Sequence, residues 1–149
     1  DAILLHLDEP TPQLFRAVSL MAFVSIREQT FDSTTETAIA SVATAVIFQK
    51  LFPGFDPSQF NGIQLPTLFD ELWEIHNSYD PNLIPQTLAR FHDPEYSGSD
   101  VPDDMWISFV RELCRIGQKD FTKLLERSRP IPLNISNSLQ GLPPYQPPA

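Results

Sequence analysis

The stretch that decides the fold is PDDMWISFVRELCRIGQKDFTKLLERS, residues 102–128. Its apolar residues recur at intervals of three and four, the spacing that places side chains on one face of an α-helix. Pro102 and the two aspartates after it suit a first helical turn, because carboxylates there complement the helix dipole. The pattern predicts one long helix ending near Ser128, with a buried face made of Trp106, Phe109, Val110, Leu113, Ile116, Phe121, Leu124 and Leu125.

Basic residues follow the same predicted helix at intervals of four, namely Arg111, Arg115, Lys119, Lys123 and Arg127. On a continuous helix, this step makes a slanting stripe beside the apolar face. Five cations on one rigid helix fit an acidic protein groove or the phosphates of a nucleic acid. The alternative interpretation is an ordinary solvated face, whose late cations complement the helix dipole. We expect the stripe to bind a partner.

Charge is distributed unevenly along the 149 residues, whose formal net charge is −9. The part through Asp104 holds 16 acidic and 4 basic residues, whereas the part from Met105 onward holds 3 acidic and 6 basic residues. An acidic body therefore carries a basic C-terminal segment. Such asymmetry indicates an electrostatic partner, which is another protein, a nucleic acid or the acidic body itself. The acidic total argues against general binding to polyanions.

Two further helices are expected in the first third of the chain. Thr11-Pro12 is typical of an N-cap followed by proline, and the apolar segment up to Gln29 predicts a largely enclosed helix. Ser33-Thr-Thr-Glu36 has the spacing of a capping box. The helix that it opens is expected to end near Phe52, and its small residues favour a central position.

The middle of the chain predicts shorter elements. Pro53–Pro66 is expected to be a loop whose phenylalanines pack on the core. Thr67 is expected to cap a short helix that ends near Tyr79, and Pro85–His92 allows about two more turns. The acidic loop Asp93–Asp104 then leads into the long helix.

Residues 130–149 are rich in proline and predict an extended or polyproline II arm rather than regular helix. The chain therefore divides into a helical domain, residues 1–129, and this arm. The arm contains a PxxP spacing, which docks on aromatic grooves of partner proteins in other systems. We expect four of its residues to contact a partner, namely Leu142, Pro144, Tyr145 and Pro147. The alternative is that the arm folds back over its own helices as a stabilising strap.

These features together predict an all-α protein with one compact domain of four to five helices and an extended C-terminal arm. The composition, 42% hydrophobic and 19% charged, excludes a wholly disordered chain. No apolar run is long enough to span a membrane, so we expect no membrane partner. The first eight residues lack the pattern of a secretory signal. The single cysteine cannot form an internal disulfide, and we expect a cytoplasmic protein.

No motif predicts a catalytic residue, a cofactor or a metal site. The three histidines lack metal-ligand spacing, and Cys114 lies on the apolar side of the long helix, where a buried thiol is the simplest interpretation. The Asp93–Asp104 loop approaches the spacing of a calcium-binding loop. However, Asp100 occupies a position that is normally apolar, and Asp104 replaces the longer bidentate glutamate.

The sequence therefore favours a non-enzymatic structural, assembly or protein-interaction subunit. Its basic helix face and its arm would bind a protein, either a second copy of the chain or another protein. One alternative is a coat-protein-like or nucleoprotein-like RNA-binding subunit that uses the basic stripe. The other alternative is a small enzyme with a dispersed site, built from His76, His92 and the Asp93–Asp104 loop.

Overall fold

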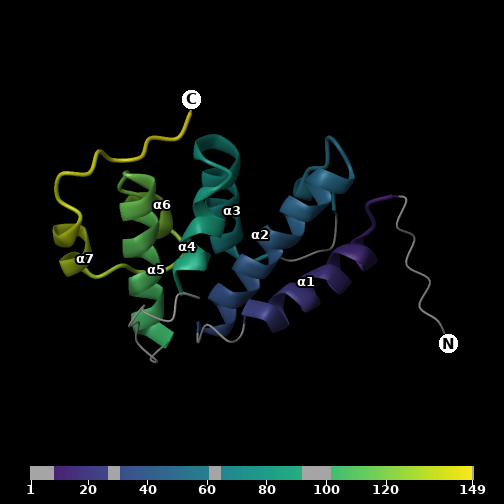
Figure 1. Ribbon diagram of the computed structural model, residues 1–149, viewed down its shortest axis with the longest axis horizontal. Coiled ribbons are helices and arrows are strands. Elements are labelled where there is room, and N and C mark those ends of the chain that lie inside the picture. The colour runs from purple at the N-terminus through teal and green to yellow at the C-terminus, as the bar shows by residue number, and fades with distance from the viewer. Residues whose placement is uncertain (1–8, 27–30, 61–64, 92–101, 149) are drawn as a thin grey trace.

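The computed structural model describes residues 9–26, 31–60, 65–91 and 102–148. These residues form seven α-helices and no β-strand, which confirms the all-α prediction (Figure 1). The count exceeds the four to five helices expected, because the long helix is interrupted and the arm contains a helix of its own. The helices are α1 (Pro12–Ile26), α2 (Ser33–Leu51), α3 (Thr67–Glu74), α4 (Leu83–Phe91), α5 (Pro102–Gly117), α6 (Thr122–Leu125) and α7 (Leu133–Ser138).

Helices α1 and α2 run antiparallel at one end of the molecule, and α2 lies between α1 and α3 (Figure 1). The buried small residues of α2, among them Ala38 and Ala45, allow its neighbours to approach closely. The Ser19 hydroxyl donates a hydrogen bond to the Thr44 hydroxyl, with 3.0 Å between the oxygens, and so joins the two helices. The central position expected for this helix is therefore confirmed.

The expected N-caps are confirmed at one helix and wrong at two. The Thr11 hydroxyl accepts a hydrogen bond from the Leu14 amide at 3.2 Å, as an N-cap does. The N-cap of α2 is Asp32 instead of Ser33, because the Asp32 carboxylate accepts the Thr35 amide at 3.0 Å and so displaces the register by one residue. Thr67 is the first residue of α3, after an N-cap that makes no side-chain hydrogen bond.

The expectation that the first helix is largely enclosed is wrong on one of its faces. Leu14 and Phe15 are buried, but Leu20 and Met21 are 66% and 70% exposed. Only α2 is packed extensively against this helix within the described part of the chain. A single helical neighbour covers one side of a helix, so its remaining apolar residues meet solvent.

Aromatic side chains fill the space between α1, α2 and the loop that follows α2. The Phe15 and Phe48 rings meet edge to face with centroids 5.3 Å apart, and Phe55 and Phe60 pack against both. Edge-to-face contacts of this kind add to the free energy gained from burial. The loop therefore packs on the core as expected, and it includes a 3₁₀ turn at Pro57–Gln59.

The predicted long helix is interrupted, so the prediction of one element to Ser128 is wrong. Helix α5 ends at Gly117, and Gln118 adopts a left-handed backbone with φ of 55°. The Asp120 carboxylate then accepts the Thr122 amide at 2.9 Å and the Thr122 hydroxyl at 2.6 Å. Aspartate that binds nearby backbone in this way competes with helix propagation. Helix α6 consequently begins as a separate element at Thr122.

The proline-rich arm packs against its own chain. It contains α7, so the expectation of no regular helix is wrong there, and Ile135 and Leu139 bury their side chains against the body. Further on, the Asp120 amide donates to the Pro143 carbonyl and the Tyr145 amide donates to the Asp120 carbonyl, both at 2.9 Å. Figure 1 shows the last residues crossing from α7 back toward α3. This geometry corresponds to the strap alternative.

Candidate protein-interaction face

The predicted partner-binding cations all lie in the C-terminal third of the fold, but on four different segments. Arg111 and Arg115 belong to α5, Lys119 lies in the turn after it, Lys123 belongs to α6, and Arg127 follows α6. Arg115, Lys123 and Arg127 are exposed, whereas Arg111 and Lys119 are half-buried. We call these five residues, with Leu142, Pro144, Tyr145 and Pro147 of the arm, the C-terminal face.

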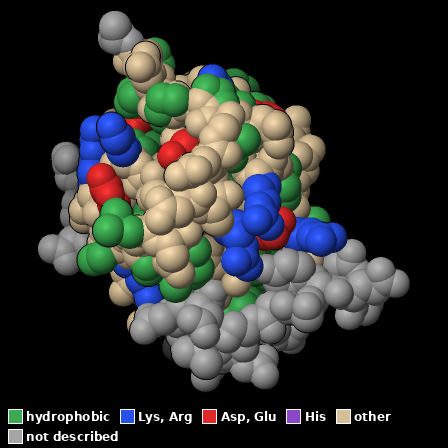
Figure 2. Space-filling model, turned by 90° about the vertical axis from the view of Figure 1, so that its left-hand side faces the viewer, with side chains coloured by type: hydrophobic (Ala, Val, Ile, Leu, Met, Phe, Trp, Pro, Cys, Tyr) green, Lys and Arg blue, Asp and Glu red, His purple; other side chains and the backbone are tan. Residues whose placement is uncertain are grey.

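A single continuous stripe of cations does not form, and the prediction of one is wrong. The step of four residues makes a stripe only on an unbroken helix, and the chain turns after Gly117. Figure 2 shows the Lys and Arg side chains of this end of the molecule in separate groups, with Asp or Glu side chains beside them. The face is therefore a mosaic with a basic excess.

One basic group is completed by a residue that the sequence did not indicate. Arg90 of α4 brings its Nε to 4.0 Å from Glu112, and the Arg115 guanidinium lies 3.9 Å from the same carboxylate. Helices α4 and α5 are packed together, which carries Arg90 to this place. Arg90 and Glu112 are far apart in sequence, so no local spacing could have predicted their contact.

The arm and Lys119 border a cleft of about 370 Å³. Its walls include Tyr79 from the π-helical turn Ile75–Tyr79, and Pro144 and Tyr145 from the arm. Tyr145 packs on Phe121 with ring centroids 5.1 Å apart and meets Tyr79 edge-on at 5.9 Å. The Tyr79 hydroxyl donates to the Gly117 carbonyl at the end of α5. Aromatic packing thus holds this part of the arm beside a cation.

The other arm residues predicted to bind a partner differ in exposure. Leu142 is half-buried against the core, whereas Pro144 and Pro147 are exposed. The Tyr145 hydroxyl oxygen is shielded from solvent and has no hydrogen-bond partner within the described ranges of the chain. The exposed prolines are therefore the arm positions that a partner can reach most directly.

Arg129 stabilises the fold and contributes little free charge to the face. It forms an ion pair with Asp32 and donates to the Thr35 hydroxyl at 3.0 Å. Its guanidinium also lies 5.4 Å from the centroid of the Trp106 ring. Burial alone would raise the pKa of Asp32, but hydrogen bonds from Thr35 and the contact with Arg129 hold that pKa below its ordinary value. This pair ties the residue that precedes the arm to the N-cap of α2.

The groups that the enzyme alternative would use are only partly described. His76 is buried and stacks on Trp73 at 5.3 Å, and burial together with nearby Lys50 lowers its pKa. His92 and residues 93–101 lie outside the described residues, as does most of the loop weighed for calcium. Burial raises the pKa of Cys114 to about 12, which makes its thiol a poor nucleophile.

No cluster of three or more His, Cys, Asp or Glu suited to a metal ion is found in the described part of the chain. Within the same ranges, no helix has the length and apolar character needed to cross a membrane. Comparison with protein-family models, curated proteins and solved structures gives no significant match.

Proposed function

We propose that this chain is a non-enzymatic protein-interaction module, whose C-terminal face binds an acidic surface of a partner protein. The observation that carries the proposal is the uneven distribution of charge along the chain. The segment from Met105 onward has a formal charge of +3 and contains α6, α7 and all of α5 except its first turn, where Asp103 and Asp104 lie (Figure 1). The preceding residues carry −12. A basic segment on an otherwise acidic chain orients an acidic partner during encounter.

The arm gives the face an apolar component beside its cations. Pro144 is exposed next to Lys119, and both border the cleft that Tyr79 and Tyr145 line. Protein interfaces combine aromatic and arginine side chains with a polar rim, and the C-terminal face has both kinds of residue. The arm is already ordered on its own domain, so little conformational entropy would be lost when a partner binds to it.

A protein partner accounts for the mosaic of charges better than a nucleic acid does. Binding to nucleic acid takes most of its free energy from many phosphate contacts, which a continuous basic track supplies. Here the cations are divided between segments, and Glu112 lies between Arg90 and Arg115. The acidic remainder of the chain would also repel a long polyanion. An acidic protein segment of limited length avoids both difficulties.

The proposal is tested by reversing charge at either end of the molecule. One variant carries Arg115→Glu and Lys123→Glu on the C-terminal face, and the matched variant carries Arg16→Glu and Lys50→Glu on α1 and α2. Binding of a labelled hexaglutamate peptide is measured by fluorescence anisotropy at low salt, with a single-stranded oligonucleotide as a second probe. We expect the first variant to lose at least tenfold in peptide affinity and to lose more than the matched variant.

Two results would contradict the proposal. Equal losses in the two variants would show that only the net charge matters, and that the C-terminal face has no special role. Tighter binding of the oligonucleotide than of the peptide would favour the RNA-binding alternative. Circular dichroism of each variant checks that the helices are intact.

A further inference from the structure

Arg111 is a half-buried cation without a compensating group. Its Nε atom is shielded from solvent and has no hydrogen-bond acceptor among the residues that the structure describes. No ion pair or hydrogen bond joins the Arg111 side chain to any residue that the structure describes. An arginine stays protonated at every physiological pH, so it cannot relieve the cost of burial by losing its proton. A group in this condition is suited to an anion from outside the chain.

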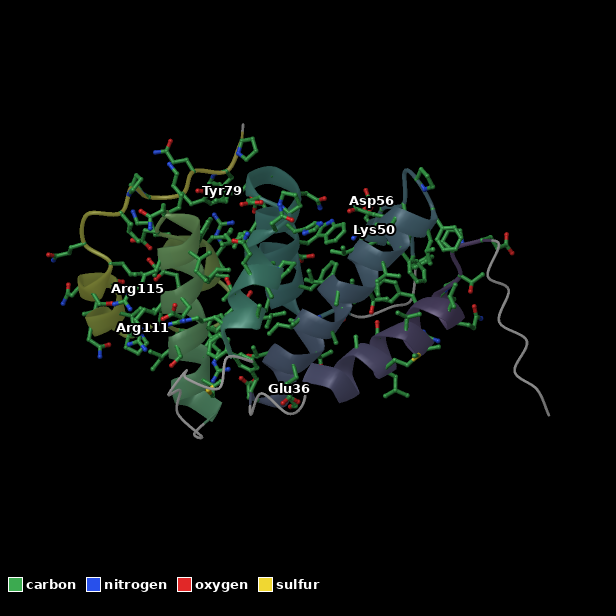
Figure 3. The ribbon with its side chains drawn as sticks, viewed as in Figure 1. Glu36, Lys50, Asp56, Tyr79, Arg111 and Arg115 are labelled. Carbon is green, nitrogen blue, oxygen red and sulfur yellow. The ribbon has the colours of Figure 1, made fainter. Side chains whose placement is uncertain are left out.

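The surroundings of Arg111 add positive charge. Arg115 lies one helical turn further along α5, and Figure 3 shows both side chains extending from α5 toward α7. The carboxylate closest along the helix, Glu112, is already approached by Arg115 at 3.9 Å and by Arg90 at 4.0 Å. Glu112 is therefore approached by two other guanidinium groups, and no ion pair between it and Arg111 is found among the described residues.

We propose that Arg111 and Arg115 form a binding site for a carboxylate of an acidic peptide segment in the partner. The proposal rests on the proposed function and names the residues at which recognition is centred. Guanidinium groups present planar pairs of donors that match the two oxygens of a carboxylate. Two arginines one turn apart repel each other in the free protein, and an anion between them removes that repulsion.

The short extent of the site favours a peptide carboxylate over a polyphosphate chain. The two arginines span one turn of α5, and Glu112 adjoins them on the side of Arg90. A string of phosphates that extended past the pair would meet this carboxylate. A single peptide carboxylate on the α7 side of the helix would be separated from Glu112 by Arg111 and Arg115.

The test compares Arg111→Gln with Arg127→Gln in the full chain. Arg127 is an exposed cation of the same face, so the control removes the same charge by the same substitution. Hexaglutamate is titrated by fluorescence anisotropy, and the melting temperature Tm is measured with hexaglutamate, with hexaglutamine and with sodium phosphate. Binding to the native state raises Tm in proportion to the occupancy of the site.

We expect Arg111→Gln to weaken hexaglutamate binding about tenfold, as the loss of a charge-assisted hydrogen bond does, and Arg127→Gln to weaken it less than twofold. Hexaglutamate should raise the Tm of the native chain, and hexaglutamine should not. Without ligand, Arg111→Gln should melt at or above the native Tm, because an uncompensated cation has been removed. Arg111→Lys keeps the charge but loses the planar donors, so its affinity for hexaglutamate should lie between that of the native chain and that of Arg111→Gln.

Each contrary result has a distinct meaning. Equal loss in the Arg111 and Arg127 variants would overturn the site while leaving the C-terminal face as the binding surface. A strong Tm rise with phosphate at the same charge concentration would overturn the assignment to a peptide carboxylate. Failure of the native chain to bind hexaglutamate at low salt would overturn the proposed function itself. If Arg111→Gln does not fold, Arg111→Lys replaces it in the comparison with Arg127→Gln.

Discussion

Replacing Leu139 by alanine should destabilise the protein, because the arm is part of its hydrophobic core. Leu139 follows α7 directly and is 2% exposed, whereas Leu133, the first residue of α7, is 82% exposed. Leu-to-Ala substitutions at buried sites cost about 2–5 kcal/mol, depending on how far the surroundings can collapse. Helix α7 has only six residues and no side-chain N-cap, so it can settle into part of the space. We therefore expect a loss of about 2–3 kcal/mol.

The assay is equilibrium unfolding in urea, followed by the fluorescence of Trp73 and Trp106. For a protein of this size, a loss of that magnitude lowers the urea midpoint by roughly 1–2 M at an unchanged slope. Leu133→Ala is the matched control and should change the unfolding free energy by less than about 0.5 kcal/mol. If Leu139→Ala costs no more than Leu133→Ala, the arm is not packed on the domain and the reasoning fails.

The same packing bears on the prediction that the arm mediates assembly. Light scattering of the full chain beside a chain ended at Arg129 measures the mass of each. A strap that packs on its own domain predicts equal association states, with a lower thermal midpoint for the shortened chain. A smaller association state of the shortened chain, with a near-native midpoint, would instead show that the arm joins copies.

Three other experiments test the packing at the end of α5, the N-cap of α2 and the burial of Cys114. Gly117→Ala should lower the free energy of unfolding by about 1–3 kcal/mol. The added Cβ would lie 2.8 Å from Leu83 Cδ2 and 3.0 Å from Phe121 Cε2, and both of these side chains are buried. An unchanged midpoint in a thermal or urea melt would contradict this. Asp32→Ala should cost about 1–2 kcal/mol at pH 7. Since the pKa of Asp32 is lowered on folding, its contribution is present above the unfolded value of 3.8 and should disappear as the pH falls through the folded pKa. Cys114 should resist thiol reagents at pH 8 in the folded protein and react fully in guanidinium, because its pKa is about 12; rapid labelling of the native chain would show that this side of α5 is open.

The helical class was predictable because helix caps and apolar spacing are local signals. The interruption after α5 was not predicted, because the apolar spacing continues across it: Phe121, Leu124 and Leu125 bury their side chains in the same core as Leu113. The period of apolar residues reports burial, and two helices packed in one core can preserve it. Gly117 is a local signal for the end of a helix. The need for glycine at this position, however, comes from its close approach to Leu83, which is a tertiary contact.

The candidate site was predictable in composition and only partly in geometry. Arg111 and Arg115 lie one turn apart on α5, as their spacing required. The positions of Lys123 and Arg127 depend on the turn at Gln118, and that turn separates them from the arginines of α5. The approach of Arg90 to Glu112 depends on the packing of α4 against α5, which is a tertiary contact without a local signature.

The most direct test of the central claim is the salt dependence of hexaglutamate binding to the native chain. On the function proposed above, the C-terminal face recognises an acidic partner mainly through charge, and exposed charges are screened within about 10 Å at 0.1 M salt. Affinity measured by fluorescence anisotropy should therefore fall by about tenfold or more between 20 and 200 mM sodium chloride. An affinity that stays constant over this range would show that the cations only solvate the surface, and it would contradict the account.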